Sequence, residues 1–231
     1  MSEWVVKRDN FEVMGKFLGA FCKDGEVVIR DSKMSCIVVD TANVAIAQVE
    51  IDVEGDREAT FKLDFEALTK ALSVSKAESV IVSVIPNMMV IKIGSHVMRI
   101  TELSMLSKPV KHVPKLKYET CVKVEAKEIL DMLAGIVRAL DNKVVFKLQD
   151  KVLSITVEGT ILQDTFETPV DVEGDVRVVI PSDYLEDIAK GLKGKCKEVS
   201  LEMRTDSPLI VKAEIDGGRV GVMIAPRIVS D

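Results

Sequence analysis

Apolar and polar residues alternate in short runs over most of the chain, a pattern typical of β-strands. The runs are rich in Val and Ile and are separated by turn residues such as those at 23–25 and 216–218. We predict strands at residues 27–30, 36–39, 44–51, 80–84, 88–93 and 97–103, and again at 144–148, 152–157, 176–180, 199–203, 209–215 and 219–224. Most of the chain is therefore expected to form sheets.

Four segments instead carry apolar residues three and four positions apart, which predicts amphipathic helices. They lie at residues 10–22, 64–73, 126–140 and 182–192. Asp64 and Ser182, the first residues of the second and fourth segments, are residue types that favour the N-cap position.

The order of these elements repeats. A strand, a helix and three strands follow one another at 61–101 and again at 178–226, and each half also opens with a helix followed by strands. The simplest packing is α+β: two similar domains, each with two helices on one face of an antiparallel sheet. Segment 103–118 has two prolines, four lysines and no acid, which indicates an extended linker. We predict domains at 1–105 and 118–231, joined by a connecting loop at 106–117.

The composition is that of a globular protein with a substantial core. Hydrophobic residues make up 47% of the 231 residues, charged residues make up 29%, and the formal net charge is −6. Global disorder is excluded by this apolar content. The chain lacks both a run of about 18 apolar residues and a signal-like start, so we expect an intracellular protein.

Signals of catalysis and metal binding are weak. His96 and His112 are the only histidines, and neither lies beside a nucleophile in the sequence. The four cysteines are scattered without a C-x-x-C pair, which predicts buried free thiols rather than zinc ligands or disulfides. We expect no catalytic residues, no metal and no cofactor. The alternative is a small-molecule enzyme with a duplicated fold, which would need a pocket with perturbed titratable groups.

Basic residues lie toward the ends of the predicted helices, and acids lie toward their beginnings. This distribution stabilises helices through their dipoles. It also places bases where they could face a phosphate backbone, since an acidic protein can bind nucleic acid through one basic face. The bases concerned are Lys16, Lys70, Lys76, Arg138, Lys190, Lys193 and Lys195.

Four stretches carry a resemblance to a known family: 38–51, the linker centred on Pro114, 183–192 and above all 207–227. The last joins a Pro-Leu strand, a turn, a final strand and an Ala-Pro-basic ending. Over essentially its whole length the sequence resembles the sliding clamps of the proliferating cell nuclear antigen (PCNA) family, in their archaeal-like form.

The resemblance implies the DNA clamp fold and a ring of six domains made by three chains. The helices would line a hole that encloses duplex DNA without sequence preference, and the bases named above would face the DNA. Such a processivity factor has no catalytic activity. It tethers DNA polymerase, flap endonuclease and DNA ligase in replication and repair, and a clamp loader places it on DNA. No membrane partner is implied. The location would be the cytoplasm, at the nucleoid, in an archaeon and the nucleus in a eukaryote.

Two protein-binding surfaces also follow from the resemblance. Short hydrophobic peptide motifs of partners would bind at Val39, Val44, Ile46, Leu106, Val113, Pro208, Met223, Ile224, Ala225 and Pro226. For Val44 and Ile46 a place in the strand core is the alternative. Subunits would join by pairing of strands near 96–102 and 161–168, through His96, Met98, Ile100, Ile161, Gln163 and Thr165.

The linker departs from the family pattern. It carries Lys108, Lys111, Lys115 and Lys117 where acidic or neutral residues are common, and Lys111 stands where an apolar anchor is expected. This leaves open a specialised clamp, or one subunit of a mixed trimer, with a different set of partners.

Overall fold

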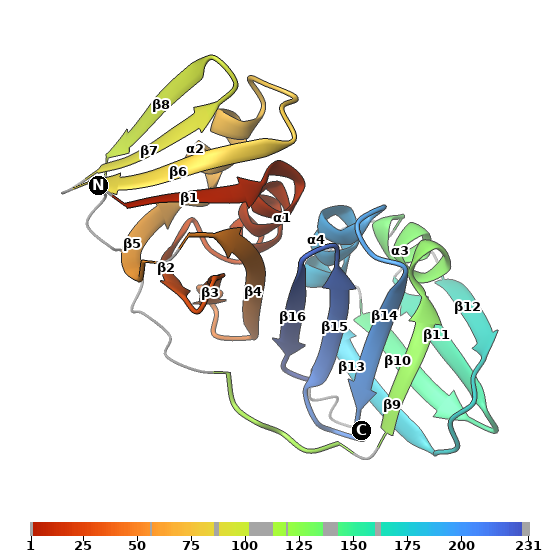
Figure 1. The fold of residues 1–231 in the computed structure, drawn as a ribbon. Helices are drawn as coiled ribbons and strands as arrows, with labels where there is room; N and C mark the ends of the chain where they lie inside the picture. Colours follow the sequence, from red (N-terminus) through yellow and green to blue (C-terminus); the bar gives the residue numbers. More distant parts are fainter. Residues whose placement is uncertain are drawn as a thin grey trace. The chain divides into compact units, whose positions relative to one another are not determined.

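The computed structural model describes residues 2–55, 57–85, 88–101, 113–118, 120–135, 143–159 and 163–227. The chain forms two compact units (Figure 1). Unit 1 comprises Met1–Thr41, Ile46–Val113 and Ile215–Val220, and unit 2 comprises Ala42–Ala45, Pro114–Glu214 and Gly221–Asp231. Each unit thus includes a short segment from the other half of the sequence.

The two halves of the chain have the same order of elements: strand, helix, four strands, helix, three strands. The first half contains β1 (Ser2–Lys7), α1 (Arg8–Gly19), β2 (Asp24–Arg30), β3 (Lys33–Val39), β4 (Ala45–Glu54), β5 (Ala59–Asp64), α2 (Phe65–Leu72), β6 (Ser79–Ile85), β7 (Met88–Ile93) and β8 (His96–Thr101). The second half contains β9 (Thr120–Glu125), α3 (Ala126–Ala134), β10 (Lys143–Gln149), β11 (Val152–Glu158), β12 (Gln163–Pro169), β13 (Val176–Pro181), α4 (Asp183–Leu192), β14 (Glu198–Met203), β15 (Leu209–Ile215) and β16 (Gly218–Ile224). The predicted α+β repeat is confirmed.

The strand order also repeats. In the first half the strands form the antiparallel sets β8-β7-β6-β1 and β4-β3-β2-β5. In the second half the corresponding sets are β16-β15-β14-β9 and β12-β11-β10-β13. Each strand of one half therefore has a counterpart in the same place in the other half.

One hairpin turn is shared by both halves. Asp31 and Ser32 join β2 to β3 with φ angles of 51° and 57°, and Asp150 and Lys151 join β10 to β11 with 50° and 61°. Two-residue turns with positive φ match the twist of the strands they connect. The turn therefore repeats, with Asp at its first position in both halves and a different residue at its second.

The helices of each unit pack against each other, and their apolar faces are buried. In unit 1, α1 and α2 approach so closely at Gly15 that a Cβ atom there would lie 3.0 Å from Thr69 Oγ1 and 3.1 Å from Leu68 Cδ2. In unit 2, α3 and α4 pack in the same way. The fully buried side chains include Phe11, Phe17, Phe65 and Leu68 in unit 1 and Ile129, Phe146, Leu185 and Ile188 in unit 2.

The first helix differs from prediction at both ends: it begins at Arg8 and ends at Gly19. The third runs to Ala134, with Gly135 as its C-cap, and the predicted continuation at 136–140 lies outside the described residues. Asp64 caps α2 as predicted and accepts a 2.8 Å hydrogen bond from the Ala67 amide. Ser182 precedes α4 in helical conformation, so its side chain makes no capping hydrogen bond among the described residues.

The alternation pattern missed the strands β1, β9 and β12. β12, with the sequence QDTFETP, lacks the apolar run that marks a strand, because most of its side chains are exposed. The expected burial of the free cysteines holds for Cys36 and is wrong for Cys121, which is exposed on β9. Within the described part of the chain, no helix is long and apolar enough to cross a membrane.

Candidate functional site

The predicted DNA-facing lysines gather at the ends of the helices. Lys16, Lys70 and Lys190 lie in the last turns of α1, α2 and α4. Lys193 is the C-cap residue of α4, and Lys76 and Lys195 lie in the turns that follow α2 and α4. Arg138 lies outside the described residues.

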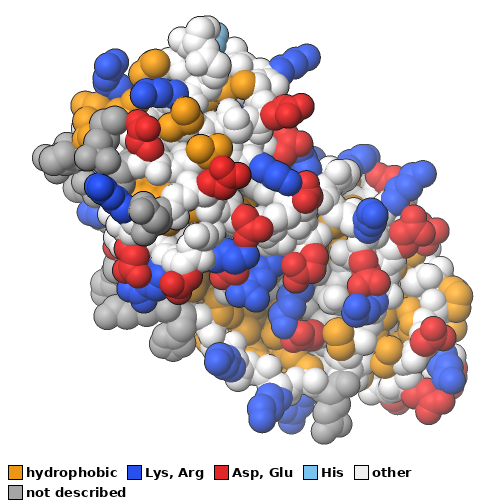
Figure 2. All heavy atoms as spheres, viewed as in Figure 1, with side chains coloured by type: hydrophobic (Ala, Val, Ile, Leu, Met, Phe, Trp, Pro, Cys, Tyr) orange, Lys and Arg blue, Asp and Glu red, His pale blue; other side chains and the backbone are white. Residues whose placement is uncertain are grey.

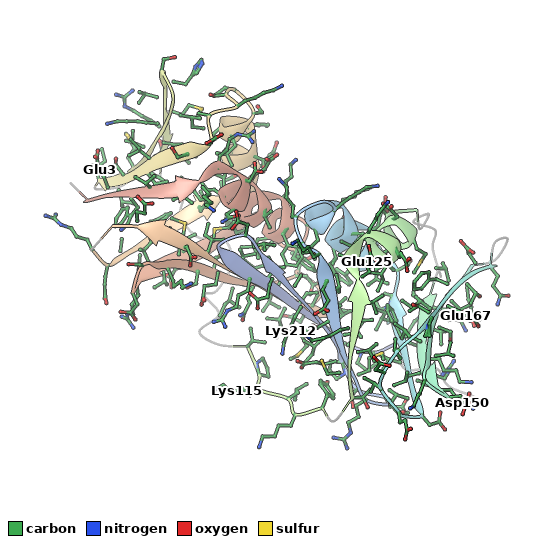
Figure 3. The ribbon with its side chains drawn as sticks, turned by 45° about the vertical axis from the view of Figure 1, so that its right-hand side comes forward. Glu3, Lys115, Glu125, Asp150, Glu167 and Lys212 are labelled. Atoms are coloured by element: carbon green, nitrogen blue, oxygen red, sulfur yellow. The ribbon has the colours of Figure 1, made fainter. Side chains whose placement is uncertain are left out.

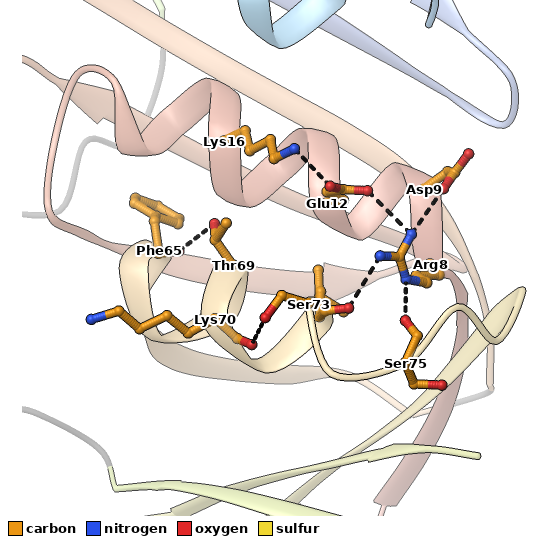
Figure 4. A network of polar contacts seen from close by, with 10 residues as sticks. Arg8, Asp9, Glu12, Lys16, Phe65, Thr69, Lys70, Ser73 and Ser75 are labelled. Atoms are coloured by element: carbon orange, nitrogen blue, oxygen red, sulfur yellow. Dashed lines mark hydrogen bonds and ion pairs between the residues drawn. The ribbon is translucent and has the colours of Figure 1, made fainter. Parts of the chain in front are cut away.

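Four of these lysines form ion pairs within the chain. Lys16 Nζ lies 2.7 Å from Glu12 Oε1 on the same helix (Figure 4), and Lys70 and Lys190 pair in the same way with Glu66 and Glu186. In unit 2, Lys193 Nζ lies 2.7 Å from Asp131 Oδ1 and so joins α4 to α3. Each helical pair places the acid four residues before the base, which is the favourable orientation.

The ion pairs shift the titration of their members. The hydrogen bond and charge of Lys70 lower the pKa of Glu66, and Glu66 raises the pKa of Lys70 for the same reasons. The ammonium of Lys193 likewise lowers the pKa of Asp131. Both carboxylates therefore stay ionised well below neutral pH.

The helices carry as many acids as bases, or more. In α1, Arg8 and Lys16 balance Asp9 and Glu12, while α4 has three acids and a single base, Lys190. On the face seen in Figure 2, acidic and basic side chains are intermixed rather than gathered by sign. Such a surface would hold phosphates weakly.

Arg8 is a site residue that the sequence pattern did not reveal (Figure 4). It stands at the start of α1, where the helix dipole disfavours a cation. Its guanidinium donates to the carbonyl oxygens of Leu72 (3.1 Å), the last residue of α2, and of Ser75 (2.9 Å) in the segment that follows, and it pairs with Glu12 at 3.2 Å. Arg8 thus joins the start of α1 to the end of α2. The corresponding residue of α3 is Ala126, so unit 2 lacks this link.

β8 in unit 1 and β12 in unit 2 are exposed edge strands with one side unpaired among the described residues. β8 pairs with β7 on one side only, and β12 pairs with β11 on one side only. The side chains of both strands alternate between exposed and half-buried. A free edge of this kind is a template for pairing with another chain.

The two faces of these edges differ in chemistry. Met98 of β8 lies opposite the buried Ile91, and Phe166 of β12 lies opposite the buried Ile155, so both half-buried side chains are on the core side of their sheets. Arg99 and Glu167 point to the other side (Glu167 is labelled in Figure 3). Each edge thus carries a large apolar side chain on its core side and a charged side chain, Arg99 or Glu167, on the other.

The predicted subunit-interface residues divide between these edges. His96, Met98 and Ile100 lie on β8, Gln163 and Thr165 lie on β12, and Ile161 lies outside the described residues. Phe166 was not among the predicted residues. It is the one large apolar side chain in QDTFETP, and that isolation in a polar strand is the signal that could have identified it.

The predicted peptide-binding residues fall in both units. In unit 1, Val39 and Ile46 are paired across β3 and β4 and are half-buried, on the face opposite the buried Val38 and Ala47. A core position for Ile46 is therefore excluded. In unit 2, the Ala225 amide donates to the carbonyl of Val44, which is also half-buried, at 2.8 Å.

The remaining positions of this set vary in exposure. Val113, Pro208 and Pro226 are half-buried, whereas Met223 and Ile224 are buried and Leu106 lies outside the described residues. In unit 2 the Tyr118 hydroxyl donates to the Pro208 carbonyl at 2.7 Å. Of the linker lysines, Lys115 and Lys117 are exposed, and Lys108 and Lys111 lie outside the described residues. The described residues contain no group of three His, Cys, Asp or Glu side chains placed to hold a metal ion.

Solved sliding-clamp structures match the fold over essentially the full chain. PCNA from A. fulgidus, solved with the C-terminal region of FEN-1 bound, matches with a TM-score of 0.87 and 20% identity, covering 100% of both chains. PCNA from Entamoeba histolytica matches with a TM-score of 0.86 and 13% identity over 98% of this chain and 99% of that one. The chain has the sliding-clamp fold.

A PCNA2–PCNA3 complex from Sulfolobus tokodaii provides a further match, with a TM-score of 0.82 and 18% identity over 98% of this chain and 99% of that one. No protein-family model and no curated protein sequence matches the chain. The likeness to sliding clamps is thus carried by the three-dimensional structure.

Proposed function

We propose that this protein is a sliding clamp, a DNA polymerase processivity factor that encircles duplex DNA as a trimeric ring. The observation that carries the proposal is the duplicated domain: two halves with the same strand order and helix pair, matching solved clamps over the full chain. The protein would act by topological enclosure, without catalysing a reaction.

The helix surface supports a sliding contact with DNA. Lysines are present on α1, α2 and α4, yet most are balanced by acids within the chain. Because the phosphate backbone supplies most of the affinity of non-specific DNA binding, a balanced surface would bind DNA weakly and in no fixed register. Processivity would then depend on closure of the ring.

The free edges of β8 and β12 support the ring. An antiparallel pairing of β8 with β12 of a second copy would place Met98 and Phe166 on the core face and Arg99 and Glu167 on the other. A head-to-tail contact of this kind closes into a ring when its rotation permits. Since β8 carries Arg99 and β12 carries Glu167 on the side away from the core, the two edges are complementary within one chain. This complementarity favours a homotrimer over a mixed ring.

Partners would bind through short hydrophobic peptides. One matching clamp was solved with the C-terminal region of FEN-1 bound. We propose that flap endonuclease, DNA polymerase, DNA ligase and the clamp loader engage this chain through the half-buried residues Val39, Val44, Ile46, Val113, Pro208, Ala225 and Pro226. The exposed Lys115 and Lys117, which follow Val113 in the sequence, favour peptides with acidic flanks.

A retention experiment tests the function. The protein is loaded with its cognate loader onto a nicked circular DNA and separated from free protein at high salt, with and without cutting of the circle. We expect retention on the closed circle and loss after linearisation, together with longer products from the cognate polymerase on a primed circle. Equal loss from circular and linear DNA, with no gain in product length, would contradict the proposed function.

A further inference from the structure

The two halves of the chain repeat one ion pair on the helix surface. Lys70 stands two residues before the end of α2 and pairs with Glu66, and Lys190 stands two residues before the end of α4 and pairs with Glu186. The helices otherwise differ in sequence, FEALTKAL against DYLEDIAKGL. The two helices thus share this ion pair although most of their other residues differ.

The two pairs differ in the exposure of their carboxylates. The side chain of Lys190 is 59% exposed and that of Glu186 only 15%, so this carboxylate is enclosed by its surroundings and the amine is the accessible partner. The side chains of Lys70 and Glu66 are both exposed, at 74% and 66%. Both amines can therefore reach a ligand from solvent, but each must first leave its carboxylate.

We propose that Glu66 and Glu186 are positioning residues that hold Lys70 and Lys190 back from the phosphates of enclosed DNA, so that the ring slides instead of binding tightly. This inference rests on the proposed clamp function. A lysine paired with a carboxylate adds no net charge, and a phosphate gains it only by displacing that carboxylate. Each passing phosphate would thus form a brief contact that the glutamate reverses.

Other charged groups of the helix surface are less suitable for testing this inference than Glu66 and Glu186. Glu12 also holds Lys16, but it pairs with Arg8 as well, so its removal would disturb the link between α1 and α2. Lys76 forms no ion pair with another described residue and would contact phosphate without competition. Glu66 and Glu186 are therefore the acids whose removal tests the inference most directly.

The experiment compares the wild-type protein with the double variant Glu66→Gln/Glu186→Gln. Fluorescence anisotropy with a short linear duplex gives the dissociation constant between about 50 and about 200 mM salt. Freeing the two lysines should tighten binding about tenfold at the lowest salt and steepen the dependence of log K on log salt by about 1 to 2. Glutamine keeps the shape of the side chain, and native mass measurement verifies that assembly is unchanged.

Two further variants show whether the lysines cause the change. Glu50→Gln/Glu202→Gln removes the same charge from the Arg219 and Lys212 pairs, which lie on strands away from the helices (Lys212 is labelled in Figure 3). It should leave DNA binding within twofold of wild type. Adding Lys70→Gln/Lys190→Gln to the first variant should abolish the gain.

The outcomes separate this inference from the proposed function. Wild-type protein that is not retained on closed circles contradicts the clamp function itself. If wild type is retained but Glu66→Gln/Glu186→Gln keeps its affinity and salt dependence, the inference alone is overturned. Equal tightening by the Glu50→Gln/Glu202→Gln control also overturns it, because net charge would then explain the effect.

Discussion

Cys36 is the most strongly perturbed titratable residue of the described chain. It is 2% exposed, and burial raises the pKa of its thiol from the ordinary 9.0 to about 12. A Cβ atom added to Gly25 would lie only 2.8 Å from the Sγ atom of Cys36, so the thiol occupies the space that this glycine leaves free. Cys36 therefore acts as a small apolar core residue.

This burial predicts a pH-dependent contribution to stability. Because the folded pKa exceeds the unfolded one, the contribution of the thiol is complete below pH 9 and is lost as the pH rises toward 12. The stability difference between wild type and Cys36→Ala should therefore shrink by about 1.4 kcal/mol between pH 8 and pH 10, as measured by urea unfolding.

Thiol labelling provides the control. At pH 8 a maleimide should modify the exposed Cys121 in the native protein and reach Cys36 only after unfolding. Rapid labelling of Cys36 in the native state, or a stability difference that stays constant with pH, would contradict the assigned burial.

At the scale of elements, one side chain links α1 to α2 in addition to their apolar packing. Arg8 is 18% exposed and joins the start of α1 to the carbonyls of Leu72, at the end of α2, and Ser75, just beyond it, through two charged hydrogen bonds. Replacing it with Met should leave those carbonyls without this partner and lower the free energy of unfolding by about 2–3 kcal/mol. Urea unfolding measures the loss, and Arg8→Lys should recover only part of the stability because Lys lacks the fork of donors.

Arg30→Met is the matched control for Arg8→Met. Arg30 also pairs with an acid, Glu58, but both side chains are more than 60% exposed. Its removal should change stability by less than about 0.5 kcal/mol. Equal effects of the two substitutions would show that Arg8 is no more than a surface charge.

The elements that the sequence predicted well are those with a strong apolar period. The strands β7 and β15 match their predicted bounds, and Asp64 caps α2 as its residue type implies. The alternation pattern missed β12, a strand that only the family resemblance predicted near 161–168, because an exposed edge strand has no need of an apolar run. The same exposure is what makes it a candidate interface, so the pattern was weakest at a site of proposed function.

The candidate DNA surface was predictable only in part. The sequence identified the lysines on the helices, because bases favour the C-terminal parts of helices and these lysines fall outside the apolar stripes that face the core. It did not identify their balance by Glu66 and Glu186, nor the role of Arg8, since both depend on contacts that form only when the side chains are placed. Residue type and spacing thus locate a surface, while its net electrostatics need the structure.

At the scale of the whole molecule, assembly should depend on the opposite charges of the two free edges. Arg99 of β8 and Glu167 of β12 point to the same side of their sheets, away from the core. In a β8–β12 junction between copies they would attract each other. Arg99→Glu or Glu167→Arg alone would place like charges across all three junctions and should weaken the trimer about tenfold or more.

The double variant Arg99→Glu/Glu167→Arg restores opposite charges and should recover the trimer. Native mass spectrometry over a dilution series follows the trimer, whose mass is three times 25.4 kDa, about 76 kDa. Lys147→Glu, on the interior strand β10, serves as the control and should assemble like wild type. If both single variants stay trimeric at the dilution where wild type does, the junction does not use these edges. If wild type forms trimers only with a sister chain, the mixed ring is favoured, since edge complementarity within one chain would then not suffice for closure.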